Sequence, residues 1–133
     1  MADGIDGRSR ELLEAKNFCH IATIGPDGKP DVAVVWVDVN GEDVLLNSAE
    51  GRTWPENLRR DPRAHLTVVN SEDPYEYVSI DGRVVEVTHD GADEHIDKLA
   101  QKYFGQERYP GRAPDEVRLL IRVKPETVSI RGG

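Results

Sequence analysis

Residues 47–63 carry the side chains of this chain that are best suited to bind an anion. Their sequence, NSAEGRTWPENLRRDPR, places four arginines in one short stretch of a protein whose formal net charge is -8. Free N–H groups at a helix start, the helix dipole and a fixed guanidinium together favour phosphate. Residues of the required kinds lie directly before a predicted helix: Ser48, Gly51 and Arg52. The stretch therefore predicts a phosphate-binding site.

The same stretch has a simpler interpretation as an ordinary connection from a strand to a capped helix. Thr53 and Glu56 have the spacing of a capping box, and Pro55 lies in the first turn, where its missing N–H is harmless. Glu50 and Glu56 would repel phosphate unless their carboxylates point away. Both interpretations remain open from these residues alone.

An apolar segment precedes this stretch on a predicted hairpin strand. Val34, Val35 and Trp36 could form a flat wall there, and a phosphate holder beside such a wall is what a flavin-like cofactor needs. Trp36 and Trp54 could equally belong to the core or to a dimer interface, where aromatic residues are enriched. The loop 108–112, which reads RYPGR, is either a solvated loop or a lid over an anionic ligand.

The sequence lacks the common catalytic and metal-binding signatures. It contains no Walker loop, GxGxxG, CxxC or HExxH motif, and its four histidines lack metal-ligand spacing. No Ser-His-Asp set can be recognised, because no hydroxyl lies in a turn that resembles a nucleophile elbow. The single cysteine, Cys19, excludes an internal disulfide and predicts a buried apolar side chain. We expect no bound metal.

Charge and hydropathy narrow the classes of partner. A pI near 5.0 argues against nucleic acid and membrane surfaces, so any anion must be held by a local basic cluster. No apolar run reaches the length of a membrane helix, and the N-terminus lacks a basic-then-apolar signal sequence. These features predict a cytoplasmic globular protein with a small-molecule ligand.

The elements that must position these residues are mostly short strands. Periodicity and capping residues predict helices over 9–17 with Ser9 as N-cap, over about 53–61, and over 92–104 with Asp90 as N-cap. Turn signals bound strands over 18–24, 31–39, 44–47, 64–70, 75–87, 117–123 and 127–130. Asp81-Gly82 fits either a hairpin turn or a bulge. The order favours one mainly β domain over 1–133, an antiparallel sheet closed or nearly closed into a barrel.

Several segments, taken in order, resemble one known family. The chain is similar to the flavin and deazaflavin oxidoreductases of the pyridoxamine-phosphate-oxidase-like split β-barrel superfamily, and most similar to its small actinobacterial group that depends on coenzyme F420. The resemblance spans nearly the whole chain. Its carriers are IATIGPDGKP at 21–30, VVWV at 34–37, GR at 51–52, NLRRDPR at 57–63, YVSIDGRV at 77–84, KY at 102–103 and YP at 109–110.

This resemblance implies a six- to seven-stranded antiparallel split β-barrel, like that of FMN-binding proteins, and a homodimer with two cofactor sites at its interface. It also implies that Asp81-Gly82 is a kink within one long strand. The positions that match the family's phosphate-holding segment are Asn47, Ser48, Gly51, Arg52 and Thr53, with Asn57 facing the same pocket. Those that match the strand behind the ring system are Val34, Val35 and Trp36. Those that match residues from the partner subunit are Tyr77, Arg108 and Tyr109.

The function that the resemblance implies is hydride transfer from reduced F420 to a small or medium-sized apolar organic acceptor, with Tyr77 or solvent as proton donor. Quinones, unsaturated lactones and biliverdin-like tetrapyrroles are acceptors of this kind. Residues 53–56, TWPE, stand where many relatives carry additional lysine or arginine. An FMN-dependent oxidoreductase and a non-catalytic dimer that sequesters a flavin, haem or tetrapyrrole therefore remain alternatives.

Overall fold

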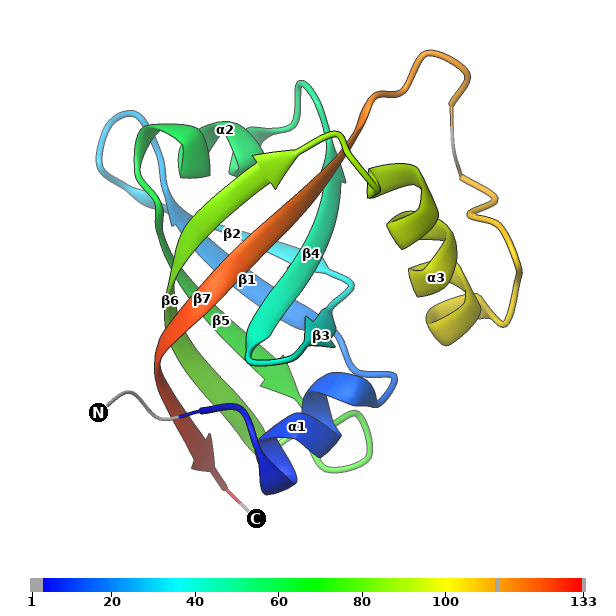
Figure 1. Cartoon of the computed structure of the whole chain (residues 1–133). Coiled ribbons are helices and arrows are strands. Elements are labelled where there is room, and N and C mark those ends of the chain that lie inside the picture. Colours follow the sequence, from blue (N-terminus) through cyan, green and yellow to red (C-terminus); the bar gives the residue numbers. More distant parts are fainter. Residues whose placement is uncertain (1–3, 112, 133) are drawn as a thin grey trace.

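In residues 4–111 and 113–132, which the computed structural model describes, seven antiparallel strands form one sheet that curls into a barrel flanked by three helices (Figure 1). The sheet order is β2-β1-β5-β6-β7-β4-β3. The helices are α1 (Gly7–Glu14), α2 (Thr53–Arg60) and α3 (Ala92–Phe104). The strands are β1 (Cys19–Ile24), β2 (Pro30–Val35), β3 (Asp38–Asn40), β4 (Asp43–Ala49), β5 (Arg63–Val69), β6 (Tyr77–Thr88) and β7 (Arg118–Arg131). The mainly β antiparallel barrel predicted from the sequence is confirmed.

Alternating burial along the strands builds one apolar core inside the barrel. In β1 every second side chain is buried, and Cys19 is a free, buried thiol as predicted. β4 is buried on both faces, because its inner face lines the core while α3 contacts its outer face. Trp54 and Leu58 of α2 join the same core, so α2 closes one end of the barrel. Among the described residues no helix is long and apolar enough to cross a bilayer.

The helix starts differ from the predicted ones in their capping residues. α3 has the predicted bounds and buries Ile96, Leu99 and Tyr103, but its N-cap is Gly91 in a left-handed conformation and not Asp90. Glycine adopts this conformation without steric cost, and it sets the direction in which the chain enters the helix. In α1 the N-cap is Asp6, and Ser9 lies one turn inside, where its hydroxyl accepts the Asp6 N–H at 3.1 Å. The predictions of Ser9 and Asp90 as N-caps are therefore wrong.

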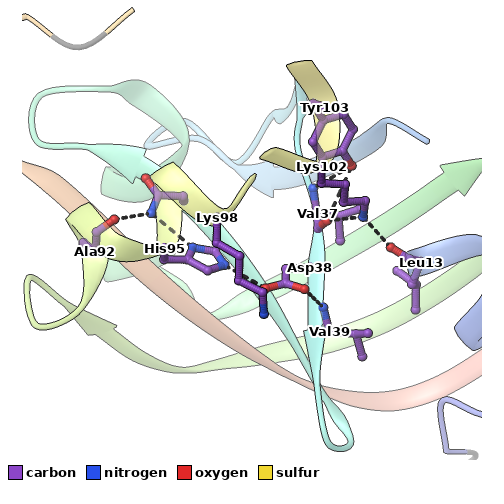
Figure 2. A network of polar contacts seen from close by, with 10 residues as sticks. Leu13, Val37, Asp38, Val39, Ala92, His95, Lys98, Lys102 and Tyr103 are labelled. Carbon is purple, nitrogen blue, oxygen red and sulfur yellow. Dashed lines mark hydrogen bonds and ion pairs between the residues drawn. The ribbon is translucent and has the colours of Figure 1, made fainter. Parts of the chain in front are cut away.

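The predicted strand 31–39 is interrupted at Trp36 and Val37, which separate β2 from β3. The fully buried Val37 pairs with α3 instead of with a strand: its N–H donates to the Tyr103 hydroxyl at 3.1 Å, and its carbonyl accepts from Lys102 Nζ at 2.7 Å (Figure 2). Lys102 also donates to the Leu13 carbonyl at the end of α1 at 2.8 Å. Burial lowers the pKa of Lys102 to about 8. These contacts replace the missing ladder and fix the orientation of Trp36.

The two longest strands, β6 and β7, pair along most of their lengths. β6 continues through Asp81 and Gly82 with a shift in register, which confirms the predicted kink. β7 continues through Pro125, so the prediction of two separate strands is wrong. Pro125 is tolerated because β4 pairs with β7 only as far as Val123, and the residue opposite on β6 is Gly82.

Candidate functional site

A cavity of about 160 Å³ lies where the ends of β2 and β4 meet α3 and the start of α2. We call it the Trp36 cavity. Its lining residues that the sequence analysis named as candidates are Val34, Val35, Trp36, Asn47, Arg52 and Tyr109. Its other lining residues are Trp54, Ile96, Leu99 and Arg118. The fold thus brings the predicted apolar wall and part of the predicted phosphate segment to one place.

Trp36 is held in a cluster of aromatic rings. It stacks on Tyr103 with ring centroids 5.0 Å apart and an interplanar angle of 5°. Tyr109 meets Trp36 edge-on at 5.8 Å, and Phe104 does so at 4.9 Å. Stacked and edge-on pairs are the favourable arrangements of aromatic rings. The wall of the cavity is therefore a rigid apolar surface, and Tyr109 reaches it from its own chain.

Arg118, at the start of β7, places a buried positive charge in the wall of the cavity. It is 4% exposed. Its Nε and Nη2 donate to Asn47 Oδ1 at 2.9 and 2.6 Å, and its Nη1 pairs with Glu116. Its guanidinium also lies 5.2 Å from the centre of the Tyr109 ring. The sequence analysis missed this residue, although an arginine next to the apolar run Leu119-Leu120-Ile121 was an available signal.

Asn47 links Arg118 to α3. While Oδ1 accepts from Arg118, Nδ2 donates to the Ala92 carbonyl at 2.9 Å and lies 3.2 Å from Nδ1 of His95. Asn47 and His95 are both buried. A buried amide with all its groups paired is held in one orientation. Asn47, predicted as a phosphate ligand, is therefore engaged with protein groups and shapes the cavity by holding Arg118.

Behind His95 the chain of contacts continues to Asp38 of β3 (Figure 2). Asp38 Oδ2 lies 3.2 Å from both His95 Nε2 and Lys98 Nζ, and Oδ1 accepts the Val39 N–H at 2.8 Å. Burial alone would raise the pKa of Asp38, but the hydrogen bonds from His95 and Val39 and the charge of Lys98 outweigh it and lower the pKa to about 2. Asp38 is therefore ionised at neutral pH.

The start of α2 is free of side-chain capping. Its N-cap is Arg52, and no side chain caps the first turn, so the predicted capping box of Thr53 and Glu56 is wrong. Glu56 instead pairs with Arg59 at 2.6 Å, because residues three apart lie on one face of a helix. Pro55 lies in the first turn as predicted. Arg52 is exposed, and its side chain forms no hydrogen bond or ion pair with any other residue that the structure describes.

The two glutamates expected to repel phosphate are both neutralised. Glu50 pairs with Arg59 at 2.7 Å and with His89 at 2.7 Å. The hydrogen bonds from Arg59 and then His89 lower the pKa of Glu50 to about 2. This pairing removes the repulsion, but it also uses Arg59, so Arg52 and Arg118 are the arginines that line the cavity.

The remaining predicted site residues lie outside the cavity lining. Ser48 is fully buried on the face of β4 that points into the barrel, and its hydroxyl has no partner in the described part of the chain. Asn57 is also fully buried and donates to Thr23 Oγ1 at 3.0 Å. Exposed positions near the cavity are Gly51, Thr53 and Arg108. Tyr77 lies at the opposite end of β7 from Arg118, beside Arg131. Arg112 of the basic loop is outside the described residues.

A separate polar row crosses the outer face of β5, β6 and β7. His65 Nε2 lies 3.0 Å from Ser79 Oγ, and its Nδ1 lies 2.7 Å from Asp81 Oδ1. This Ser-His-Asp arrangement joins residues of two strands and was not recognisable from the sequence. Asp81 also accepts from Thr127 at 3.1 Å. The row borders a groove of about 360 Å³ that contains none of the predicted cofactor residues. Within the described residues no cluster of three or more His, Cys, Asp or Glu could hold a metal ion.

Residues 5–132 match the family model of pyridoxamine 5'-phosphate oxidase, and the chain belongs to this family. Its fold is that of the pyridoxamine-phosphate-oxidase-like oxidoreductases, as the resemblance in the sequence implied. No functionally curated protein matches the chain significantly.

Solved structures extend the comparison. An F420 reductase superposes with a TM-score of 0.83 at 26% sequence identity, covering 94% of this chain and 98% of that chain. A putative pyridoxamine 5'-phosphate oxidase from Listeria innocua gives a TM-score of 0.69 at 17% identity, covering 91% and 93%. A conserved hypothetical protein from Mycobacterium tuberculosis gives a TM-score of 0.72 at 20% sequence identity, covering 99% of this chain and 88% of that chain. The last two are similar to this chain in fold alone.

Proposed function

We propose that this protein is an F420-dependent oxidoreductase that reduces a small or medium-sized apolar organic acceptor. The observation that carries the proposal is the Trp36 cavity, which joins an apolar wall to two arginines within one chain. The structural similarity to an F420 reductase supports the choice of cofactor. When bound, reduced F420 would supply the hydride.

The cavity residues fit a ligand that combines a flat ring with a phosphate. Arg52 offers an exposed guanidinium at the entrance that forms no hydrogen bond or ion pair with another described residue, and the uncapped first turn of α2 offers N–H groups beside it. Arg118 offers a second guanidinium inside the wall. Val34 and Trp36 provide an apolar surface of the kind against which a ring system packs. The chain's own part in the reaction is thus to anchor, to orient and to exclude water.

One chain alone encloses only part of such a ligand. Pockets for ligands of drug size usually measure roughly 300–1,000 Å³, whereas the Trp36 cavity measures about 160 Å³. Val32 and Val34 of the edge strand β2 are both 61% exposed, and Val34 lines the cavity. A second copy of the chain that covered these valines would both bury their apolar surface and enlarge the pocket. We therefore propose a homodimer with the cofactor at the interface.

The proton donor stays a prediction. Tyr77 lies too far along the sheet to serve the Trp36 cavity of its own chain, so a role for this tyrosine requires the second copy. If Tyr77→Phe left turnover unchanged in a protein that still bound cofactor, solvent would be the donor.

FMN is the second candidate cofactor, and one observation favours it. Because Glu50 and Glu56 hold Arg59, the described cavity lining contains just two arginines, Arg52 and Arg118. Two guanidiniums suit a single phosphate, while the longer anionic tail of F420 would gain from the basic residues that 53–56 lack. A protein purified with FMN would be yellow, so its absorbance distinguishes this case.

The deciding experiment is a titration of the purified protein with F420 and, separately, with FMN, followed by fluorescence. The proposal predicts saturable binding of F420 and its oxidation after reduction when quinones, enones or tetrapyrroles are supplied. Preferential binding of FMN would support the second candidate. Binding of F420 without oxidation by any of these acceptors would indicate a sequestering protein, and binding of neither cofactor would contradict both enzyme functions.

A further inference from the structure

We propose that Arg118 binds the phosphate of the cofactor and that His95, acting through Asn47, holds the Arg118 guanidinium in position. The identity of the ligand rests on the function proposed above, whereas the arrangement of the three side chains is a property of the chain itself. Arg118 would be a binding residue, and His95 would be a positioning residue that does not touch the ligand.

Arg118 retains hydrogen-bonding capacity toward the cavity. A guanidinium has five N–H donors, and three are engaged here, two by Asn47 Oδ1 and one by Glu116. In the described part of the chain the remaining donors, one on each terminal nitrogen, have no protein partner. A buried arginine with spare donors in the wall of a cavity is suited to a phosphate oxygen. Because the guanidinium is already ordered, binding would cost little side-chain entropy.

The orientation of the Asn47 amide follows from its neighbours. Oδ1 must face the Arg118 guanidinium, which can only donate, and Nδ2 must face the Ala92 carbonyl, which can only accept. A flipped amide would place N–H groups against N–H groups on one side and two oxygens together on the other. The amide therefore has a single satisfactory orientation.

This orientation determines the protonation of His95. Asn47 Nδ2 donates toward His95 Nδ1, so Nδ1 must be the bare, accepting nitrogen. The ring proton then lies on Nε2 and points to the Asp38 carboxylate. A second proton on Nδ1 would oppose the Asn47 amide and break the contact that holds Arg118. Protonation of His95 should therefore loosen Arg118 and weaken phosphate binding.

Charged groups surround the His95 ring from several elements. Asp38 comes from β3, Lys98 from α3 itself, and Arg118 from β7 across Asn47, with Glu116 paired to Arg118. Further along the outer face, Asp43 of β4 and Arg122 of β7 pair with each other at 3.1 Å.

The binding role of Arg118 is tested with FMN and riboflavin, which differ by the phosphate alone. We expect Arg118→Met to weaken FMN binding at least tenfold and riboflavin binding less than twofold. Arg122→Met is the matched control on the same strand and should leave both affinities unchanged. Equal losses for both ligands, or no loss for FMN in a variant with wild-type circular dichroism, would overturn the assignment. Arg118→Lys keeps the positive charge but loses the forked donors of the guanidinium, so its FMN affinity should lie between those of the wild type and Arg118→Met.

The positioning role of His95 is tested by the pH dependence of FMN affinity. His95→Gln can accept from Asn47 and donate to Asp38 without ever becoming charged. We expect the wild type to lose affinity on acidification more steeply than His95→Gln, with the titration of FMN itself cancelling in the ratio of the two. His65→Gln, which removes a histidine from another carboxylate pair, should follow the wild type. Superimposable profiles for wild type and His95→Gln would refute the role.

A readout without cofactor separates failure of this proposal from failure of the proposed function. Nitrogen NMR of the free protein should show His95 as the Nε2–H tautomer and an Arg118 Nε–H signal that inorganic phosphate shifts. If neither FMN nor F420 binds but phosphate shifts this signal, the proposed function fails and the Arg118 site stands. The Nδ1–H tautomer would refute the His95 chain, and an Arg118 signal indifferent to phosphate would refute the binding role.

Discussion

The hydroxyl of Tyr103 should contribute strongly to stability, and Tyr103→Phe isolates its effect. The hydroxyl is buried, accepts the Val37 N–H at 3.1 Å and donates to the Asn17 carbonyl at 2.5 Å. Burial, which dominates, raises the pKa of Tyr103 to about 12, so the hydroxyl keeps its proton at any ordinary pH. A phenylalanine ring would preserve the stacking on Trp36 and leave the packing volume almost unchanged.

The magnitude follows from the groups that would lose their partners. Each hydrogen bond is worth about 0.5–1.5 kcal/mol net, and a buried donor left unpaired costs about 1–3 kcal/mol. The Val37 N–H lies at the break between β2 and β3 and has no strand ladder to return to. The Val37 carbonyl keeps its bond from Lys102 and adds nothing to the loss. We expect Tyr103→Phe to lower the free energy of unfolding by about 2–3 kcal/mol.

Equilibrium unfolding in urea measures this loss. With an m-value of about 1–3 kcal/mol/M, the midpoint should fall by about 0.7–3 M. Both proteins must be compared at one concentration, because oligomerisation would add to the apparent stability. Tyr75→Phe is the control, since Tyr75 is 77% exposed and should give no measurable change. A loss below about 0.5 kcal/mol would refute the view that Tyr103 satisfies the backbone at the break.

Three further predictions concern the kinked strand, the buried carboxylate and the cavity entrance. Gly82→Ala should lower the free energy of unfolding in urea by about 1–3 kcal/mol, because the added Cβ would lie 2.6 Å from Cγ1 of the buried Val123. An unchanged urea midpoint would contradict this close approach. Because the pKa of Asp38 falls from 3.8 to about 2 on folding, its contribution to stability should be complete above about pH 4 and be lost as the pH falls toward 2. Thermal melts of Asp38→Asn should lack this acid-dependent loss. A melting temperature that depends on pH in the same way in variant and wild type would contradict the prediction. Arg52→Gln should weaken cofactor binding about two- to fivefold at ~0.15 M salt and more at low salt, because salt screens an exposed charge. Titration calorimetry that shows the same loss of affinity at every salt concentration would contradict this prediction.

Much of the fold could be predicted because local patterns and tertiary packing agree. The spacing of Ile96, Leu99 and Tyr103 defines one face of α3, and the structure buries that face. The breaks were harder to predict. Nothing local marks the interruption at Val37, which depends on Lys102 and Tyr103 from a distant helix. Pro125 suggested a strand end, but its tolerance depends on where β4 stops pairing.

The candidate site was predictable where its residues are neighbours in sequence. Val34 to Trp36 and Arg52 follow recognisable patterns and line the cavity. Arg118 and His95 belong to the site because they contact Asn47 in the folded chain, and no spacing in the sequence reveals these contacts. Ser48 shows the converse: its position before the helix suggested a phosphate ligand, yet the alternation along β4 turns its side chain into the barrel.

The location of the cofactor site is tested most directly by NMR mapping of F420 or FMN binding on isotope-labelled protein. We expect saturable shifts that are largest at the Trp36 indole N–H and at the Nε–H groups of Arg52 and Arg118, the polar markers of the cavity. Saturable binding with shifts confined to the groove beside His65 and Asp81 would contradict the assignment of the Trp36 cavity as the cofactor site.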